Sequence, residues 1–386
     1  MNKYLKYVLV TALVLTLSIQ SSYGIAGNPD RAGQAGGTQL LINPWGRSSG
    51  LGGTNMASMS GVESVNFNIG GAVNTNGTEF AVSRSLWLGG AVGMSVNSFG
   101  LVAHVGGSRD SFGRKRNALT FSINSLDIGS IQVTTEGQPA GNGSFYSPSF
   151  TNLSIGFSHA FSNNISGGFV FKTISEGITN ARASGFAIDA GIMYKGGDND
   201  RARFGVALRN VGPALTVRGD GLSSRGVLEG YDYSMTIERR PSPYEMPSVL
   251  NIAASYDILT NTNNIPKKIR NPKDSTPLAV TSVDNRFKPV LSVSAAFTSN
   301  AFSQDQIGVG LEFTPISIFQ VRAGYVYEKN IFKADSRTFA YSGPSAGFSV
   351  NFLFGKEKQR LFGLDYSIRA AKPFSATHTF GLRLNI

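Results

Sequence analysis

Apolar and polar residues alternate with a period of two through most of the chain, in stretches of about ten residues. In residues 319–328, Phe, Val, Ala and Tyr alternate with Gln, Arg, Gly and Glu, and residues 153–161, 306–313 and 379–386 repeat the pattern. A β-strand points successive side chains to opposite faces. A tilted strand of about 9–11 residues is long enough to cross a bilayer. The alternation therefore predicts an all-β, transmembrane antiparallel β-barrel, and a large soluble β-sandwich is the alternative.

Composition favours the barrel over other classes. Only 15% of residues are charged, against roughly 25% in soluble domains, and 46 glycines are present. The one long apolar run is at the N-terminus, so helical membrane proteins are disfavoured. The chain has no cysteine, which excludes a disulfide framework.

The N-terminus is typical of a signal peptide. Lys3 and Lys6 precede an apolar segment over residues 8–19, and the small residues Ser22 and Gly24 suit cleavage after residue 24. We therefore expect residues 1–24 to be a signal peptide and, together with the predicted barrel, the protein to lie in the outer membrane of a Gram-negative cell.

The remaining chain is expected to form two parts. Residues 25–77, rich in Gly, Ser and Asn, are predicted to fold into the lumen as a plug or hatch, and residues 78–386 to form a barrel of about 14 strands. All 15 prolines lie outside the predicted strands. The predicted strand spans are 78–84, 94–106, 116–126, 150–160, 165–174, 185–195, 202–211, 248–257, 290–299, 305–314, 318–328, 345–354, 361–370 and 376–386.

An even number of strands leaves both barrel ends in the periplasm and makes alternate connections extracellular. The long connections 127–149, 212–247 and 329–344 are then outer loops. The connection 258–289 would be periplasmic, although it is long and basic. Either a strand is missed nearby or this loop has a role of its own.

Charged residues occur in the polar rows and are predicted to face the lumen. Glu312 and Arg322 belong to one tight hairpin, and Asp365 lies diagonally across the last hairpin from Arg383. Cross-strand ion pairs are a structural device in sheets. The predicted lumen network consists of Arg203, Arg209, Glu312, Arg322, Asp365, Arg369 and Arg383.

The outer loop 212–247 combines aromatic residues with arginine, which is typical of protein-binding surfaces. The competing interpretation is a loop that folds over its own barrel and meets lipopolysaccharide with its arginines. The candidate partner-binding residues are Arg218, Arg225, Tyr231, Tyr233, Arg239, Arg240, Tyr244 and Met246.

Enzymatic chemistry is not expected. His104, His159 and His378 lie far apart in the sequence, on three predicted strands and without a nucleophile motif. We predict no catalytic residues, no metal site, no cofactor and no nucleic-acid partner.

Residues 30–37 read DRAGQAGG, and residues 40–50 read LLINPWGRSSG. These segments resemble the N-terminal signature of the PorV/PorQ family, whose members are Bacteroidetes outer-membrane barrels of the FadL type, so the resemblance implies a Bacteroidetes-type cell. Further similar segments are 150–153 (FTNL), 209–213 (RNVGP), 323–328 (AGYVYE), 342–347 (SGPSAG) and 363–367 (GLDYS). The resemblance implies a part in type IX secretion, in which members resembling PorV bind the C-terminal signal domain of exported proteins at the cell surface.

Two functions therefore stay open. The first is a barrel that binds the C-terminal β-sandwich signal domain of type IX cargo, as shuttle or membrane anchor, with the type IX translocon or attachment complex as a further implied partner. The alternative is a FadL-like transporter of hydrophobic small molecules. The charged inward rows favour the first, and a continuous apolar pocket would favour the second.

Overall fold

A computed structural model describes residues 27–89, 93–109, 115–197, 200–227, 230, 233–259, 289–333, 337–355 and 360–386. The predicted signal peptide lies outside these residues, as does the basic part of the connection 258–289. Both remain predictions.

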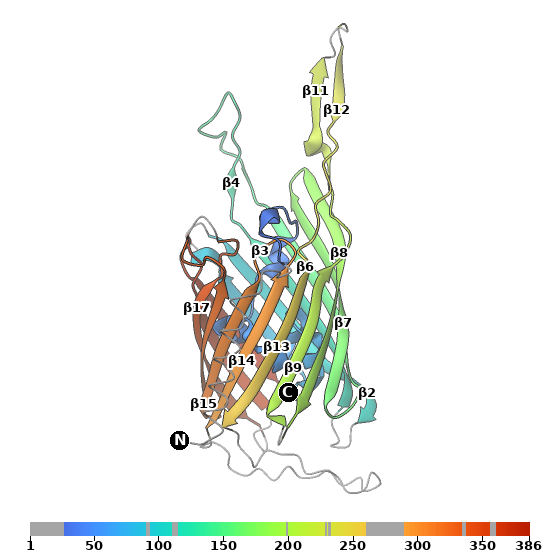
Figure 1. The fold of residues 1–386 in the computed structure, drawn as a ribbon. Coiled ribbons are helices and arrows are strands. Elements are labelled where there is room, and N and C mark those ends of the chain that lie inside the picture. The colour runs from blue at the N-terminus through green and yellow to red at the C-terminus, as the bar shows by residue number, and fades with distance from the viewer. Residues whose placement is uncertain are drawn as a thin grey trace.

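The described chain forms a closed antiparallel barrel of 14 long strands, so the predicted fold class is confirmed (Figure 1). Nearly all neighbours in the sheet are also neighbours in sequence. The long strands are β1 (Glu79–Leu86), β2 (Ser95–Arg109), β3 (Lys115–Asp127), β6 (Ser149–Ala160), β7 (Ile165–Ile178), β8 (Ala181–Gly196), β9 (Ala202–Val211), β13 (Val249–Leu259), β14 (Val290–Asn300), β15 (Gln306–Ile316), β16 (Phe319–Glu328), β17 (Gly343–Phe354), β18 (Arg360–Arg369) and β19 (Thr377–Asn385).

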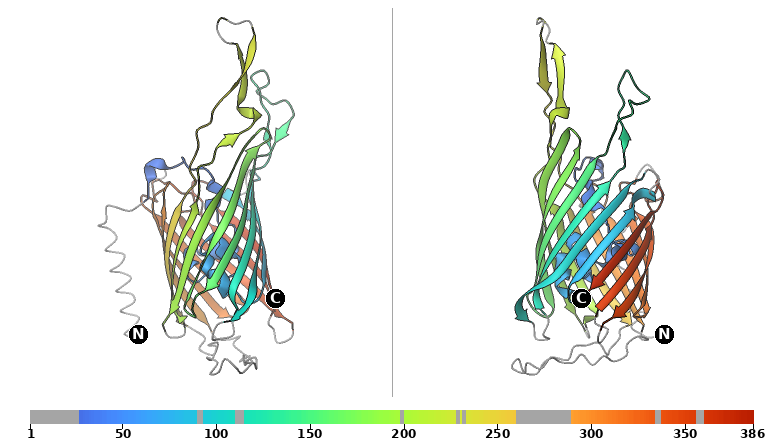
Figure 2. Two further views of the ribbon diagram at one scale, coloured as in Figure 1. Left: turned by 90° about the vertical axis from the view of Figure 1, so that its right-hand side faces the viewer. Right: turned by 180° about the vertical axis from the view of Figure 1, so that it is seen from behind.

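The barrel closes by pairing its first and last strands. Glu79 pairs with Asn385 at one end of β1, and Leu86 pairs with His378 at the other. The right-hand view of Figure 2 shows the blue start of the barrel beside its red end. Closure gives every long strand two neighbours, which removes the exposed edges that a membrane does not tolerate.

Strand boundaries differ from the predictions in two ways. β7 and β8 extend several residues further, because their polar outer ends stay paired up to Ile178 and Ala181. The second difference corrects the placement of proline. Pro315 lies in β15 at an irregularity in its pairing with β16, and Pro344 is the second residue of β17, beyond the end of its pairing with β18. Both are places where a missing N–H is tolerated.

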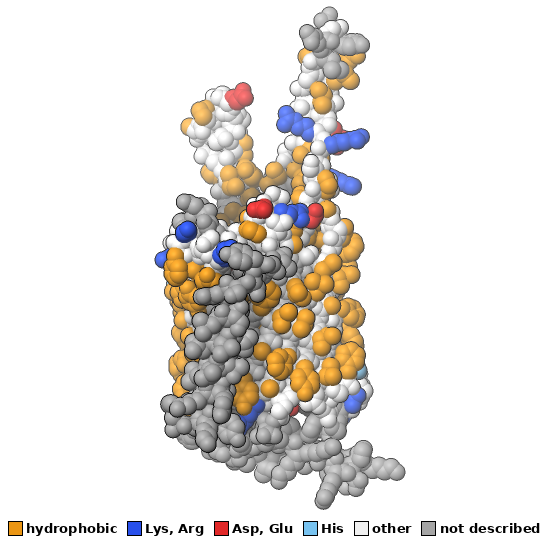
Figure 3. Space-filling view, viewed as in Figure 1, with side chains coloured by type: hydrophobic (Ala, Val, Ile, Leu, Met, Phe, Trp, Pro, Cys, Tyr) orange, Lys and Arg blue, Asp and Glu red, His pale blue; other side chains and the backbone are white. Residues whose placement is uncertain are grey.

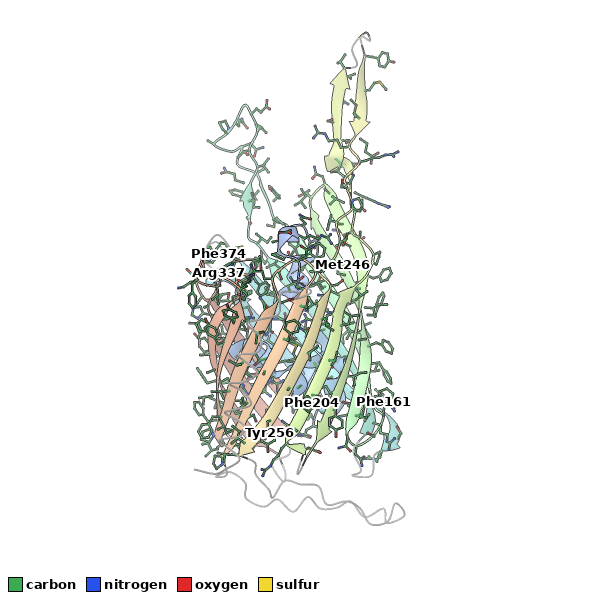
Figure 4. The ribbon with its side chains drawn as sticks, in the orientation of Figure 1. Phe161, Phe204, Met246, Tyr256, Arg337 and Phe374 are labelled. Carbon is green, nitrogen blue, oxygen red and sulfur yellow. The ribbon has the colours of Figure 1, made fainter. Side chains whose placement is uncertain are left out.

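The outward face of the barrel is apolar. Figure 3 shows hydrophobic side chains over the visible wall, and the alternate positions of each strand account for them. Figure 4 places Phe161, Phe204 and Tyr256 toward the end opposite the long outer connections, where such rings form an interfacial girdle. In the described residues, no helix is both long and apolar enough to span a membrane.

One end of the barrel carries the long connections and is taken as extracellular. There, η7 (Trp87–Gly89) follows β1, and β4 (Ile131–Gln132) pairs with β5 (Phe145–Tyr146). The connection from β9 to β13 forms β10 (Val217–Arg218), η9 (Asp220–Leu222), β11 (Ser223–Val227) and β12 (Ser234–Glu238).

The residues before β1 form short helices, and most of them lie inside the barrel (Figure 1, blue). Their glycines and polar residues favour short turns over long helices. They are η2 (Pro29–Arg31), η3 (Thr38–Leu41), α2 (Gly46–Gly50), η4 (Thr54–Ala57), η5 (Val62–Asn66) and η6 (Ile69–Asn74). We call residues 38–75 the lumen segment.

Candidate functional site

The lumen segment has an apolar core of its own that packs against the barrel wall. Trp45 and Val62 are almost fully buried and pack with Val102 of β2 and Val170 of β7. The indole N–H of Trp45 donates to Asn66 Oδ1 at 2.8 Å, so its only polar atom is satisfied. A buried indole with its hydrogen bond made is a strong anchor.

Hydrogen bonds join the lumen segment to strands around the barrel. Ser166 of β7 donates to the carbonyl of Gly70 at 2.7 Å, and Ser345 of β17 donates to that of Gly50 at 3.1 Å. Thr54 and Ser294 of β14 share a bond of 2.8 Å. Because these strands lie on different sides of the barrel, the bonds hold the segment across the whole lumen.

Arg47 fastens the segment to the start of β1. Its guanidinium lies 2.9 Å from a carboxylate oxygen of Glu63 and 3.5 Å from one of Glu79. Glu79 also accepts the backbone N–H of Val62 at 2.8 Å, and Glu63 that of Ser48 at 3.1 Å. The two carboxylates therefore balance one cation and satisfy free N–H groups at helix starts.

The predicted charged residues of the lumen face inward, and the structure brings them into pairs. Arg322 lies 2.5 Å from Glu312 directly across the β15–β16 hairpin. Arg383 lies 2.6 Å from Asp365, diagonally across the β18–β19 hairpin. Arg203 forms a third pair with a carboxylate of β13. Each ion pair joins two neighbouring strands, so these charges stabilise the sheet.

The other two predicted lumen residues, Arg209 and Arg369, contact aromatic rings and backbone carbonyls. Arg209 lies over the Phe67 ring, 5.0 Å from its centre, and donates to the carbonyl of Leu40 at 3.4 Å. Arg369 lies 4.8 Å from the centre of the Tyr341 ring and donates to its carbonyl at 3.2 Å. Both arginines therefore hold segments that cover or fill the lumen.

The most deeply buried ion pair among the described residues was not predicted from the sequence. Lys172 of β7 lies 2.5 Å from Asp189 of β8, and both side chains are nearly inaccessible. Lys172 also donates to Asn210 Oδ1 at 3.0 Å, and Asp189 accepts the backbone N–H of Asn210 at 2.7 Å. The signal was available in the sequence, since each charge stands in the inward row of its strand.

A two-stranded hairpin, β11 with β12, rises above the extracellular end of the barrel (Figure 1). Met235 and Ile237 lie on one face of it, opposite Gly226 and Ser224, and remain about two-fifths exposed. Lys and Arg side chains gather along this projection (Figure 3). Exposed predicted partner-binding residues on the hairpin and its base are Arg218, Arg225, Tyr233, Arg239 and Arg240. Tyr231 lies outside the described residues.

Two predicted partner-binding residues belong to the base of the hairpin instead. Met246 is buried against Leu40, Ile174 and Leu215 at the barrel mouth, so its side chain is not available to a partner (Figure 4). Tyr244 is partly buried and forms an antiparallel bridge with Leu215. Met246 is therefore corrected from a partner-binding residue to a packing residue, whereas partner binding by the partly exposed Tyr244 stays a prediction.

Tyr244 also links the hairpin base to the N-terminal residues. Its ring lies where a side chain at Gly36 would be, and Gly36 N–H donates to the Glu245 carbonyl at 2.8 Å. The Tyr244 hydroxyl donates to Glu176 at 3.0 Å. Burial, with help from that carboxylate, raises the pKa of Tyr244.

The histidines form structural hydrogen bonds, and two of them share Asn117. His104 bonds to the carbonyls of Thr75 at 2.7 Å and of Asn117 at 3.3 Å, and His159 bonds to the side chain of Asn117 at 2.6 Å. His378 bonds to the Tyr366 hydroxyl at 2.9 Å. Within the described residues, no three His, Asp or Glu side chains cluster as metal ligands would.

Comparison with known proteins gives a fold. No protein-family model and no curated protein sequence matches the chain. The toluene transporter TodX of Pseudomonas putida is similar at 12% identity, over 89% of this chain and 97% of that one, with a TM-score of 0.50. A FadL homologue of Pseudomonas aeruginosa is 11% identical over 89% of this chain and 98% of its own, with a TM-score of 0.48. This chain therefore shares the barrel fold of TodX, and this is the fold of outer-membrane barrels of Gram-negative bacteria.

Proposed function

We propose that this barrel binds the C-terminal β-sandwich signal domain of exported surface proteins, as a shuttle or anchor in type IX secretion. The observation that carries the proposal is the β11–β12 hairpin. An isolated two-stranded hairpin is marginally stable in water, and this one leaves Met235 and Ile237 uncovered. Its outer strand edges have no partner strand among the described residues.

A β-sandwich domain suits such a hairpin. Its edge strand can add to the edge of β11 or β12 through main-chain hydrogen bonds, and the apolar face can then be covered. The arginines around the hairpin would favour an acidic partner surface. The filled lumen agrees with this reading, because the lumen segment is bonded to several strands and the inward rows are polar.

The proposal is tested by pull-down from the native outer membrane in mild detergent, followed by mass spectrometry. Residues 223–238 are replaced by a short Gly-Ser turn, which keeps the bridge between Leu215 and Tyr244 and hence the barrel mouth. We expect the intact protein to retain an exported protein with a C-terminal β-sandwich domain, and the variant to lose it.

The matched control shortens the other outer projection, residues 131–146, and should retain the partner. A point variant sharpens the test: Met235→Ser with Ile237→Ser should weaken binding, whereas Phe145→Ser, which also removes an exposed apolar side chain, should not. Retention of the partner after removal of the hairpin would refute the assignment.

The second candidate is a transporter of hydrophobic small molecules, and the structural neighbours favour it over cargo binding. TodX is described as a toluene transporter and shares this fold. A lumen segment ahead of β1 would then act as a hatch. This candidate predicts that the purified barrel carries an apolar molecule rather than a protein, and that cells lacking the barrel take up labelled toluene or fatty acid more slowly.

A further inference from the structure

A groove of about 1030 Å³ crosses the outward face of the barrel where β1 meets β19. Most of its lining is apolar, and it extends over β2 and β3 on one side and over β17 and β18 on the other. The right-hand view of Figure 2 faces this closure. Its apolar lining includes Val82, Phe99, Ile123, Leu364, Phe380 and Leu382. Because these side chains point away from the lumen, the groove is open to lipid.

Arg84 stands in this apolar groove. It is exposed on the outward face of β1, between Phe380 of β19 and Asn97 of β2. Among outward-facing positions of the 14 long strands, in the residues that the structure describes, it is the only Lys, Arg, Asp or Glu more than one residue from a strand end. A lipid-facing arginine destabilises a barrel in proportion to its depth in the bilayer.

The described protein supplies no counter-charge for Arg84. No carboxylate in the described residues lies within ion-pair distance of it. Asp365 also lines the groove, but its carboxylate faces the lumen and binds Arg383. An anion from the surrounding lipid would restore the balance, and a guanidinium fork fits the oxygens of a phosphate.

The position of Arg84 along β1 identifies the leaflet. β1 starts at the periplasmic end and reaches the extracellular turn after Leu86. Arg84 precedes that end by two residues, roughly 7 Å along the strand. It therefore lies toward the outer leaflet, which in Gram-negative outer membranes consists largely of lipopolysaccharide.

We propose that this groove is a binding site for lipid A, the phosphorylated and acylated base of lipopolysaccharide. A phosphate of lipid A binds the Arg84 guanidinium, and Asn97 offers an amide donor beside it. An acyl chain lies in the apolar groove between Phe99 and Phe380. The site holds one lipid at the seam of the barrel and does not depend on a protein partner.

The test measures lipid A retained per barrel after purification from native outer membranes in mild detergent, by mass spectrometry. Arg84→Gln should lower retention at least about tenfold, since a bond to a charged partner is lost. Arg84→Lys should retain most of the lipid. Arg182→Gln, which removes another exposed arginine near the outer end of β8, should retain all of it.

A groove-filling variant tests the acyl site separately. Val82→Trp keeps Arg84 but occupies the groove, so it should also lower retention. The shift in gel mobility on heating shows whether each barrel is folded. Equal lipid A on the wild type and Arg84→Gln would overturn the proposal, as would a glycerophospholipid retained by the wild type in place of lipid A.

Discussion

Substitution of Gly100 by alanine tests whether the lumen segment is docked tightly against the wall. Gly100 faces the lumen from β2, and a Cβ there would lie 2.1 Å from a methyl carbon of Val62. Carbon atoms in ordinary contact are about 3.5–4.0 Å apart. Roughly 1.5 Å of movement is therefore needed.

Neither β2 nor Val62 can move away without a loss of free energy. Gly100 is paired with Ala81 on one side and Ser122 on the other, so β2 is fixed in the sheet. Val62 is fully buried, and its N–H is bonded to Glu79. Overpacking of this kind costs about 1–3 kcal/mol. We expect that loss in the free energy of unfolding, together with faster hydrogen exchange over residues 62–73.

Gly107→Ala is the matched control, because it lies on the same strand with open space around its position. Any gain from a less flexible unfolded chain, about 0.4–1 kcal/mol, is common to both variants. Urea unfolding in lipid vesicles gives the difference. In the Gly100→Ala background, Val62→Ala should recover most of the loss by removing the clashing methyl. Equal stability of the two alanine variants would refute the docked position of the lumen segment.

Substitutions at three other buried or partly buried contacts are expected to change stability. Asp189→Asn leaves Lys172 buried without its carboxylate and should lower the free energy of unfolding by about 3–5 kcal/mol in urea titrations; a loss under about 1 kcal/mol would contradict the buried pair. Trp45→Phe removes a buried indole bond and should cost about 1–3 kcal/mol by the same assay. Burial first, and then Glu176, raises the pKa of Tyr244, so the protonated hydroxyl stabilises the fold fully below about pH 10, and this stabilisation is lost as pH rises through the folded pKa. Tyr244→Phe should flatten this alkaline loss, and an unchanged pH profile would contradict the placement of the hydroxyl beside Glu176 at the barrel mouth.

The fold could be predicted because alternation is a local signal that each strand repeats. Residues 319–328 already separate an apolar row from a polar one, and β16 has these bounds. Register within a hairpin follows from the same rows, which is why Glu312 was expected beside Arg322. The outer ends of β7 and β8 were not predicted because residues 175–184 do not alternate. In the structure these ends are held by the pairing of β7 with β8, which continues past the apolar part of the barrel.

The sites were harder to predict because long-range packing decides them. Tyr244 and Met246 look like loop residues in the sequence, yet Leu40, more than 200 positions earlier, covers Met246. The missing side chain of Gly36 makes room for the Tyr244 ring. These contacts join the base of the outer hairpin to the chain that enters the lumen. Tyr244 and Met246 therefore hold the hairpin base against residues 36–40, a packing role that only the folded contacts reveal.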